Sequence, residues 1–181
     1  MFDRKKFDGD LALGRKAENN FASYLVEYYG DKLLELQWAP DKNFKAWDIK
    51  VKILEDGAEK EVTYEVKSDT KSMDTGNFVV EYLSWWNPSW INATEADYWV
   101  HYVGNWNWWI QKASVLKEAL ENSNWPKVKW WDDKASWMYK IPCSQLPILF
   151  SKVDTDVKGG EYYGETGWSD NSSSAEVPWE I

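Results

Sequence analysis

Two runs of alternating residues on either side of Asp56-Gly57 constrain the fold of this chain more than any other feature. In residues 45–53 apolar side chains occupy every second position from Trp47 onward, and residues 62–68 (VTYEVKS) alternate in the same way. A period of two is typical of a strand that buries one face. Asp-Gly between two such runs favours a tight turn. The sequence therefore predicts an antiparallel hairpin or meander in this region.

The same hairpin carries three charged residues that strand pairing would bring together. Glu65 and Lys67 lie two positions apart and share one face of their strand, and pairing through the turn places Asp48 within reach of Glu65. Two converging carboxylates suit a hard cation such as Mg²⁺, or Mn²⁺ in its place, completed by water, a phosphate and a backbone carbonyl. A lysine beside the metal can position or deprotonate the attacking water. The alternative interpretation is a ladder of salt bridges on the hairpin surface.

A helix is predicted over residues 11–29, where apolar side chains recur at helical spacing. Asp10 can serve as its N-cap, and Gly30 follows its last turn. Glu18 lies on or beside the apolar stripe, where a carboxylate needs a partner or a function. We expect the helix to pack over the sheet and to aim Glu18 at the same pocket. The alternative is an ordinary helix acid near Arg15.

The remaining sequence predicts one α/β domain over residues 1–157, followed by an acidic tail rich in Gly and Ser over residues 158–181. The tail has the composition of a disordered segment. Its acidic, apolar end resembles the partner-recruiting ends of single-stranded-DNA-binding proteins, which implies a protein partner. Within the domain we expect strands at 33–38, 78–84, 97–103 and 106–110, an irregular or hairpin segment at 125–137, a short helix or strand at 143–150, and a helix at 113–123 with Val115, Leu116, Ala119 and Leu120 facing inward.

The composition excludes several classes of protein. The single cysteine, Cys143, rules out an intramolecular disulfide framework, and with the single histidine, His101, it rules out zinc sites built from several such residues. We expect His101 to be a half-buried strand residue and Cys143 to be a small core residue. The sequence starts with charged residues and contains no long apolar run, so we expect no signal peptide and no membrane span. We therefore expect a cytoplasmic protein. With a net charge of −9, the chain needs a local basic patch or bound cations to bind nucleic acid.

The order of Glu18 on a helix, Asp48 on a strand and Glu65-Val66-Lys67 on the next strand resembles the PD-(D/E)xK nuclease superfamily, over roughly residues 10–104. The resemblance implies a restriction-endonuclease-like αβββαβ core, with a mixed central sheet flanked by helices. It also implies an endonuclease that cuts DNA with Mg²⁺. Asp48, Glu65 and the backbone of Val66 would hold the metal, Lys67 would orient the water, and Glu18 would be an auxiliary acid. The family further implies a homodimer, because two related sites suit a symmetric duplex or junction.

Two further segments, 75–82 (TGNFVVEY) and 96–100 (ADYWV), look like small phage-type endonucleases close to the Holliday-junction-resolvase-like members of that superfamily. This narrower resemblance implies action on branched or junction DNA in phage-type nucleic-acid metabolism, within the host cytoplasm if a phage encodes the chain. A function of another class stays open. The same fold can serve as a non-catalytic module that binds nucleic acid or protein, because fold alone does not settle function.

Tryptophan is unusually frequent, with 15 in 181 residues. Trp85, Trp86 and Trp90 fall in one aromatic loop and, with Lys71, are candidate contacts to nucleic acid, since bases stack on aromatic rings. They could equally cap the core or bury a dimer interface. The related endonucleases have glycines in this loop, and tryptophan tolerates the positive φ of many turns badly. Two explanations therefore stay open: the rings form a stacking platform, or an unusual codon assignment has placed tryptophan where the native protein has another residue.

Overall fold

The computed structural model describes residues 4–41, 44–84, 87–103, 107–131 and 135–153. The predicted acidic tail and the candidate contacts Trp85 and Trp86 lie outside these residues. The elements follow one another in the order α1 (Arg4–Tyr29), η1 (Gly30–Lys32), β1 (Leu33–Trp38), β2 (Ile49–Glu55), β3 (Ala58–Asp69), α2 (Ser72–Thr75), β4 (Asn77–Ser84), β5 (Asn87–Pro88), η2 (Trp90–Asn92), β6 (Tyr98–Val103), β7 (Asn107–Lys112), α3 (Ala113–Glu121), β8 (Lys127–Trp131), β9 (Ala135–Pro142), η3 (Cys143–Gln145), α4 (Leu146–Leu149) and β10 (Ser151–Val153).

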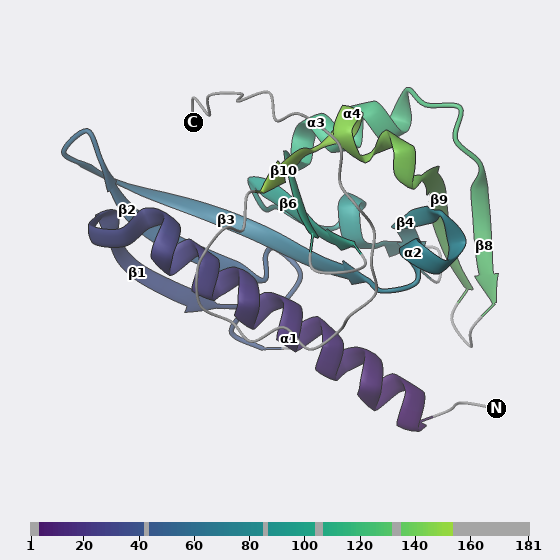
Figure 1. Cartoon of the computed structure of the whole chain (residues 1–181), viewed down its shortest axis with the longest axis horizontal. Helices are drawn as coiled ribbons and strands as arrows, with labels where there is room; N and C mark the ends of the chain where they lie inside the picture. The colour runs from purple at the N-terminus through teal and green to yellow at the C-terminus, as the bar shows by residue number, and fades with distance from the viewer. Residues whose placement is uncertain (1–3, 42–43, 85–86, 104–106, 132–134, 154–181) are drawn as a thin grey trace, which may run out of the picture.

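The strands form two sheets. A six-stranded sheet has the order β1-β2-β3-β6-β7-β10, and a four-stranded sheet has the order β5-β4-β9-β8. In the larger sheet β3 and β6 are parallel and the other neighbours are antiparallel, so the sheet is mixed. In Figure 1, α1 runs along β1, β2 and β3, and the smaller sheet lies on the other side of β6. The predicted fold class, α/β with a mixed central sheet and flanking helices, is confirmed.

The hairpin of β2 and β3 has the predicted turn. Ile49 pairs with Tyr64 and Val51 with Val62, and Asp56 and Gly57 both have positive φ angles, of 51° and 79°. Positive φ at both central residues is the geometry of a two-residue turn whose twist matches its strands. The local sequence thus sets the register of this hairpin, as the alternation predicts.

The connection from β3 to β6 differs from a simple αβββαβ core. The described residues between these strands form one short helix, α2, the 3₁₀ turn η2 and the strands β4 and β5, and β4 pairs with β9 in the smaller sheet. The strand expected at 78–84 is present, but it leaves the central sheet. It does so because Phe78 and Val80 bury completely in a second apolar core with Ile141 and Leu116.

The central sheet separates two cores, and its alternation decides which residues enter each. On one face Phe21 of α1 packs against Tyr64 and Trp108, with ring centroids 5.3 Å apart in both cases. The opposite face carries Trp99, which belongs to the second core. Tyr64 faces α1, so Glu65 faces the other side of the sheet, in register with Trp99.

Two details of the helices correct the sequence predictions. Helix α1 begins at Arg4, so Asp10 lies inside the helix and is not its N-cap. The helix can extend toward the N-terminus beyond Asp10, because Gly9 lowers the stability of a helix interior by only about 1 kcal/mol relative to alanine. Its end before Gly30 is confirmed, with a φ of +49° at that glycine. In α3, Val115 is 45% exposed and does not face the core. Among the described residues, no helix is long and apolar enough to cross a bilayer.

His101 is more deeply placed than the sequence predicts, since it is fully buried. The indole Nε1 of Trp99 donates to His101 Nδ1 at 3.3 Å, and His101 Nε2 meets no hydrogen-bond partner among the described residues. Burial, and then the charge of Lys67, lowers the pKa of His101 from 6.5 to about 3. The folded protein therefore holds this imidazole neutral at a pH where an unfolded chain would protonate it.

Acid should destabilise the protein through His101. Because only the unfolded chain binds the proton between about pH 6.5 and pH 3, the free energy of unfolding should fall by several kcal/mol across that window, at about 1.4 kcal/mol per pKa unit. Urea unfolding at stepped pH measures this. In His101→Gln, which keeps an acceptor for Trp99, the slope in this window should be shallower. Equal slopes in both proteins would contradict the assignment.

Alanine substitutions at Gly14 and at Gly57 should change the free energy of unfolding in opposite directions. A Cβ at Gly14 or at Gly57 would meet no heavy atom within 4 Å, so only backbone conformation decides the result. Gly57→Ala should lower the free energy of unfolding by about 1 kcal/mol, because alanine is strained at positive φ. Gly14→Ala, inside α1, should raise it by about 1 kcal/mol. Urea unfolding of both variants tests this, and changes of the same sign would be inconsistent with it.

Candidate active site

Asp48 immediately precedes β2, whose first residue is Ile49. The sequence predicts it in the middle of that strand, so this part of the prediction is wrong. The backbone N–H of Asp48 donates to the carbonyl of Tyr64 at 2.9 Å, and its Oδ2 accepts from the backbone N–H of Val66 at 2.8 Å. The carboxylate thus takes the position that the next carbonyl of the ladder would occupy. This bond fixes the side chain at the end of the strand, beside β3.

Lys67 lies between the two carboxylates. Its Nζ is 3.2 Å from Asp48 Oδ2 and 2.5 Å from Glu65 Oε1. The side chains of Lys67 and Glu65 are only 19% and 9% exposed, so this is a largely buried cluster and not a surface ladder of the hairpin. The three side chains do meet, as the hairpin register predicts. Farther along the hairpin, Lys50 pairs with Glu61 and Lys52 with Glu59, each at 3.5 Å.

Burial and neighbouring charges shift the pKa values of Glu65, Lys67 and Glu18. Burial raises the pKa of Glu65, Lys67 opposes that rise and Asp48 adds to it. Burial alone would lower the pKa of Lys67, but the charges of Glu65 and Asp48 outweigh it and raise the pKa above its ordinary value. The pKa of Glu18 is also raised, by burial first and then by the charge of Asp48. Negative charge is therefore crowded at this end of the hairpin.

A cavity of about 790 Å³ opens at the cluster. The cavity is lined by side chains from four places: α1, the segment between β1 and β2, β3 with the turn after it, and η2. Those that matter for chemistry are Arg15, Glu18, Asp48, Lys67, Lys71 and Trp90. The structure thus brings Glu18 to the same cavity as Asp48 and Lys67, as the helix prediction expected, and places Arg15 there as well.

The donors suit a hard divalent cation in type, although they do not form a complete protein cage. Among the described residues, no three His, Cys, Asp or Glu side chains group closely enough to hold a metal ion. Asp48 Oδ2 and Glu65 Oε1 are both within salt-bridge distance of one ammonium and so lie close to each other. The side chain of Val66 is apolar and its N–H is bonded to Asp48, so this residue could offer only its carbonyl oxygen. Water and phosphate oxygens would complete such a site.

Trp90 lies against the same ammonium, with Lys67 Nζ 5.8 Å from its ring centroid. Its ring also approaches Trp99, at 6.4 Å between centroids. Its backbone φ is +42°, a conformation that glycine adopts readily and tryptophan rarely. The exposed Lys71 lines the cavity, and its backbone N–H donates to Asp69 Oδ1 at 3.0 Å. Trp90 and Lys71 are thus at the cavity, and their contact with nucleic acid stays a prediction.

Sequence reasoning missed Thr94 and interpreted Asp69, with Thr70 and Lys71, as a solvated turn residue in preference to a phosphate contact. Thr94 Oγ1 is 3.1 Å from Glu65 Oε2. Asp69 accepts backbone N–H groups from Ser72 at 3.0 Å and from Val79 at 3.2 Å, and so ties the end of β3 to the start of β4. Asp69 is the last residue of β3, and Asp at the end of a strand is a typical turn signal. Nothing local marks Thr94, because its partner lies 29 residues away.

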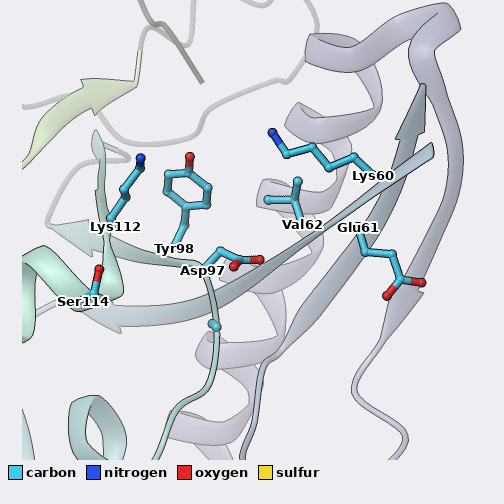
Figure 2. A pocket seen from close by; sticks show the side chains of 8 residues that line it. Lys60, Glu61, Val62, Asp97, Tyr98, Lys112 and Ser114 are labelled. Carbon is cyan, nitrogen blue, oxygen red and sulfur yellow. The ribbon is translucent and has the colours of Figure 1, made fainter. Parts of the chain in front are cut away.

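A second, smaller cavity of about 400 Å³ lies at the start of β3 and β6. Figure 2 shows the side chains of Lys60, Tyr98 and Lys112 pointing toward the same side. Lys60 is already paired there with Glu55, at 2.8 Å. None of the predicted catalytic residues lines this cavity, so it is separate from the candidate active site.

Comparisons with known proteins add little to this geometry. No family model and no curated protein matches the sequence. A solved structure titled "Structure of D212, a nuclease from a fusselovirus" is 9% identical in sequence, covers 82% of this chain and 94% of its own, and has a TM-score of 0.40. At this TM-score the similarity establishes neither a shared fold nor a shared activity.

The codon-assignment hypothesis now has a specific position to test. Because Trp90 has a left-handed backbone beside the candidate site, we expect the native protein to carry glycine at residue 90. Mass spectrometry of the peptide around this position, from protein isolated from its natural source, distinguishes the two residues directly. The peptide around Trp99 serves as a matched reference, since that ring is fully buried on a regular strand. Tryptophan at position 90 would contradict the hypothesis there.

Proposed function

We propose that this protein is an endonuclease that hydrolyses DNA phosphodiester bonds with Mg²⁺, or with Mn²⁺ in its place. The observation that carries the proposal is the position of the Lys67 ammonium between Asp48 and Glu65, at a cavity that also receives Glu18. Two close carboxylates suit a divalent metal, and a lysine beside them can orient the attacking water in metal-assisted hydrolysis of a phosphate ester. The non-catalytic module, by contrast, needs no such convergence.

In this mechanism Asp48 and Glu65 would hold the metal, and Glu18 would be an auxiliary acid on α1 at the same cavity. The bound metal would stabilise charge at the phosphate under attack and lower the pKa of bound water. Lys67 has three N–H donors, of which Asp48 and Glu65 each accept one. The third is free to orient the attacking water or to contact a phosphate oxygen.

Charge also bears on how DNA would bind. The net charge of −9 opposes a polyanion, and among the described residues that line the cavity Arg15 and Lys71 are the cationic side chains besides Lys67. Binding should therefore depend on divalent metal more than on lysine and arginine contacts. The finer proposals of branched or junction DNA as substrate, a homodimer, phage-type nucleic-acid metabolism and a cytoplasmic setting rest on the family resemblance alone.

Cleavage assays test the proposal directly. Labelled single strands, duplexes, flaps and four-way junctions are incubated with Mg²⁺ or Mn²⁺ and with wild type, Asp48→Asn or Lys67→Ala. Wild type should cut at least one substrate only when metal is present, and each substitution should reduce cleavage by about 10²-fold or more, as loss of a charge-stabilising group commonly does. Lys50→Ala removes a lysine of the same hairpin that has similar exposure and pairs with Glu61 away from the cluster, so it is the matched control and should cut like wild type.

Two outcomes would count against the nuclease. If wild type binds one of these DNAs but cuts none with either metal, the non-catalytic module becomes the better account. If Asp48→Asn cuts as fast as wild type, the cleavage does not arise from this site. The ranking of substrates tests the proposed preference for branched DNA separately.

A further inference from the structure

Thr94 connects the two segments that carry the candidate carboxylates. It follows η2 and precedes β6, and its side chain is half-buried. Its Oγ1 lies 3.1 Å from Glu65 Oε2 and 3.0 Å from the carbonyl oxygen of Ala46, two residues before Asp48. One hydroxyl therefore contacts the side chain of one carboxylate residue and the backbone that leads to the other.

The surrounding backbone holds this hydroxyl in place. The N–H of Ala96 donates to Thr94 Oγ1 at 3.2 Å, and the N–H of Thr94 donates to the carbonyl of Trp90 at 2.9 Å. The N–H of Glu95 donates to the same Ala46 carbonyl at 2.8 Å. Thr94 is thus fixed by its own turn, and the loop before Asp48 is fixed to that turn.

The hydroxyl has one proton and two acceptors within reach, so it donates to one at a time. A carboxylate is the stronger acceptor, and Ala46 keeps its bond from Glu95 in either case. With the hydroxyl donating to Glu65, Oε2 is held by Thr94 and Oε1 by Lys67. Both oxygens of Glu65 then have a defined direction, and Oε1 faces the same ammonium as Asp48.

We infer that Thr94 is a positioning residue that fixes the plane of the Glu65 carboxylate relative to Asp48. This inference rests on the proposed function, since it concerns the same pair of carboxylates. Outer partners of this kind orient the groups that bind a metal without touching it themselves. A methyl group in place of the hydroxyl would leave Glu65 held at one oxygen only. Its carboxylate would then rotate about its terminal torsion, which has a broad energy profile.

The test compares Thr94→Val, which removes the hydroxyl and keeps the shape, with Thr94→Ser, which keeps the hydroxyl. Thr63→Val is the matched control, because Thr63 lies on the same strand as Glu65 and donates to a carboxylate, Asp97 Oδ2, at 2.8 Å outside the site. Asp97 belongs to the separate cavity of Figure 2. Thermal unfolding checks that each variant is folded. Mn²⁺ affinity, measured by electron paramagnetic resonance, and the kcat and KM of DNA cleavage are then determined.

Thr94→Val should lose about 10- to 100-fold in Mn²⁺ affinity or kcat, as loss of an outer partner typically does. At saturating metal, KM for DNA should stay within about 2-fold, because Thr94 makes no uniform contribution to substrate binding. Thr94→Ser and Thr63→Val should match wild type in both readouts. The recovery with serine would assign the effect to the hydroxyl, which a general structural role of Thr94 would not produce.

The outcomes separate this inference from the proposed function. If wild type cuts DNA and Thr94→Val keeps both its kcat and its Mn²⁺ affinity, or if Thr94→Ser loses as much as Thr94→Val, the positioning role is wrong while the nuclease stands. If wild type binds Mn²⁺ but cuts nothing, the nuclease fails and the Mn²⁺ affinities alone decide on Thr94. If wild type neither binds Mn²⁺ nor cuts, both proposals are overturned.

Discussion

The bond from the backbone of Val66 to the carboxylate of Asp48 is the interaction on which the candidate site depends. A side-chain acceptor here takes the place of a backbone carbonyl in the hydrogen bonding between β2 and β3, so the sheet itself fixes the position of a charged group. From that fixed point Lys67 reaches both Asp48 and Glu65. The precision of the site therefore comes from backbone pairing, which is stiffer than any arrangement of long side chains on a loop.

The two cores explain why this cluster can be both buried and accessible. Alternation along β3 sends Tyr64 toward α1 and Glu65 toward the other face, while Asp48 lies at the end of its strand. Glu18 can then approach from the helix side and Lys67 from β3, and they meet at one cavity. The helix that stabilises one face of the sheet thus also supplies an acid to the site.

Local patterns predicted the parts of the structure that depend on neighbouring residues. The hairpin, its Asp56-Gly57 turn and the meeting of Asp48 with Lys67 follow from alternation and turn chemistry within a short stretch. The sequence did not reveal the second sheet, because a strand such as β4 has the same alternation whichever sheet it joins. Nor did it reveal Thr94, whose contact depends on how a distant turn folds back. The start of α1 was missed because the prediction began the helix at the first apolar residue of the repeat, Leu11, with Asp10 as its N-cap.

The parallel pairing of β3 with β6 also sets an order of events in folding. The β2–β3 hairpin joins neighbours in sequence and can form early, whereas the Glu65–Thr94 contact spans 29 residues and must wait until the intervening chain has closed. A chain still emerging from the ribosome would carry Asp48, Glu65 and Lys67 on its hairpin before the turn that braces them exists. The site is therefore completed only when the turn that carries Thr94 has folded back onto β3.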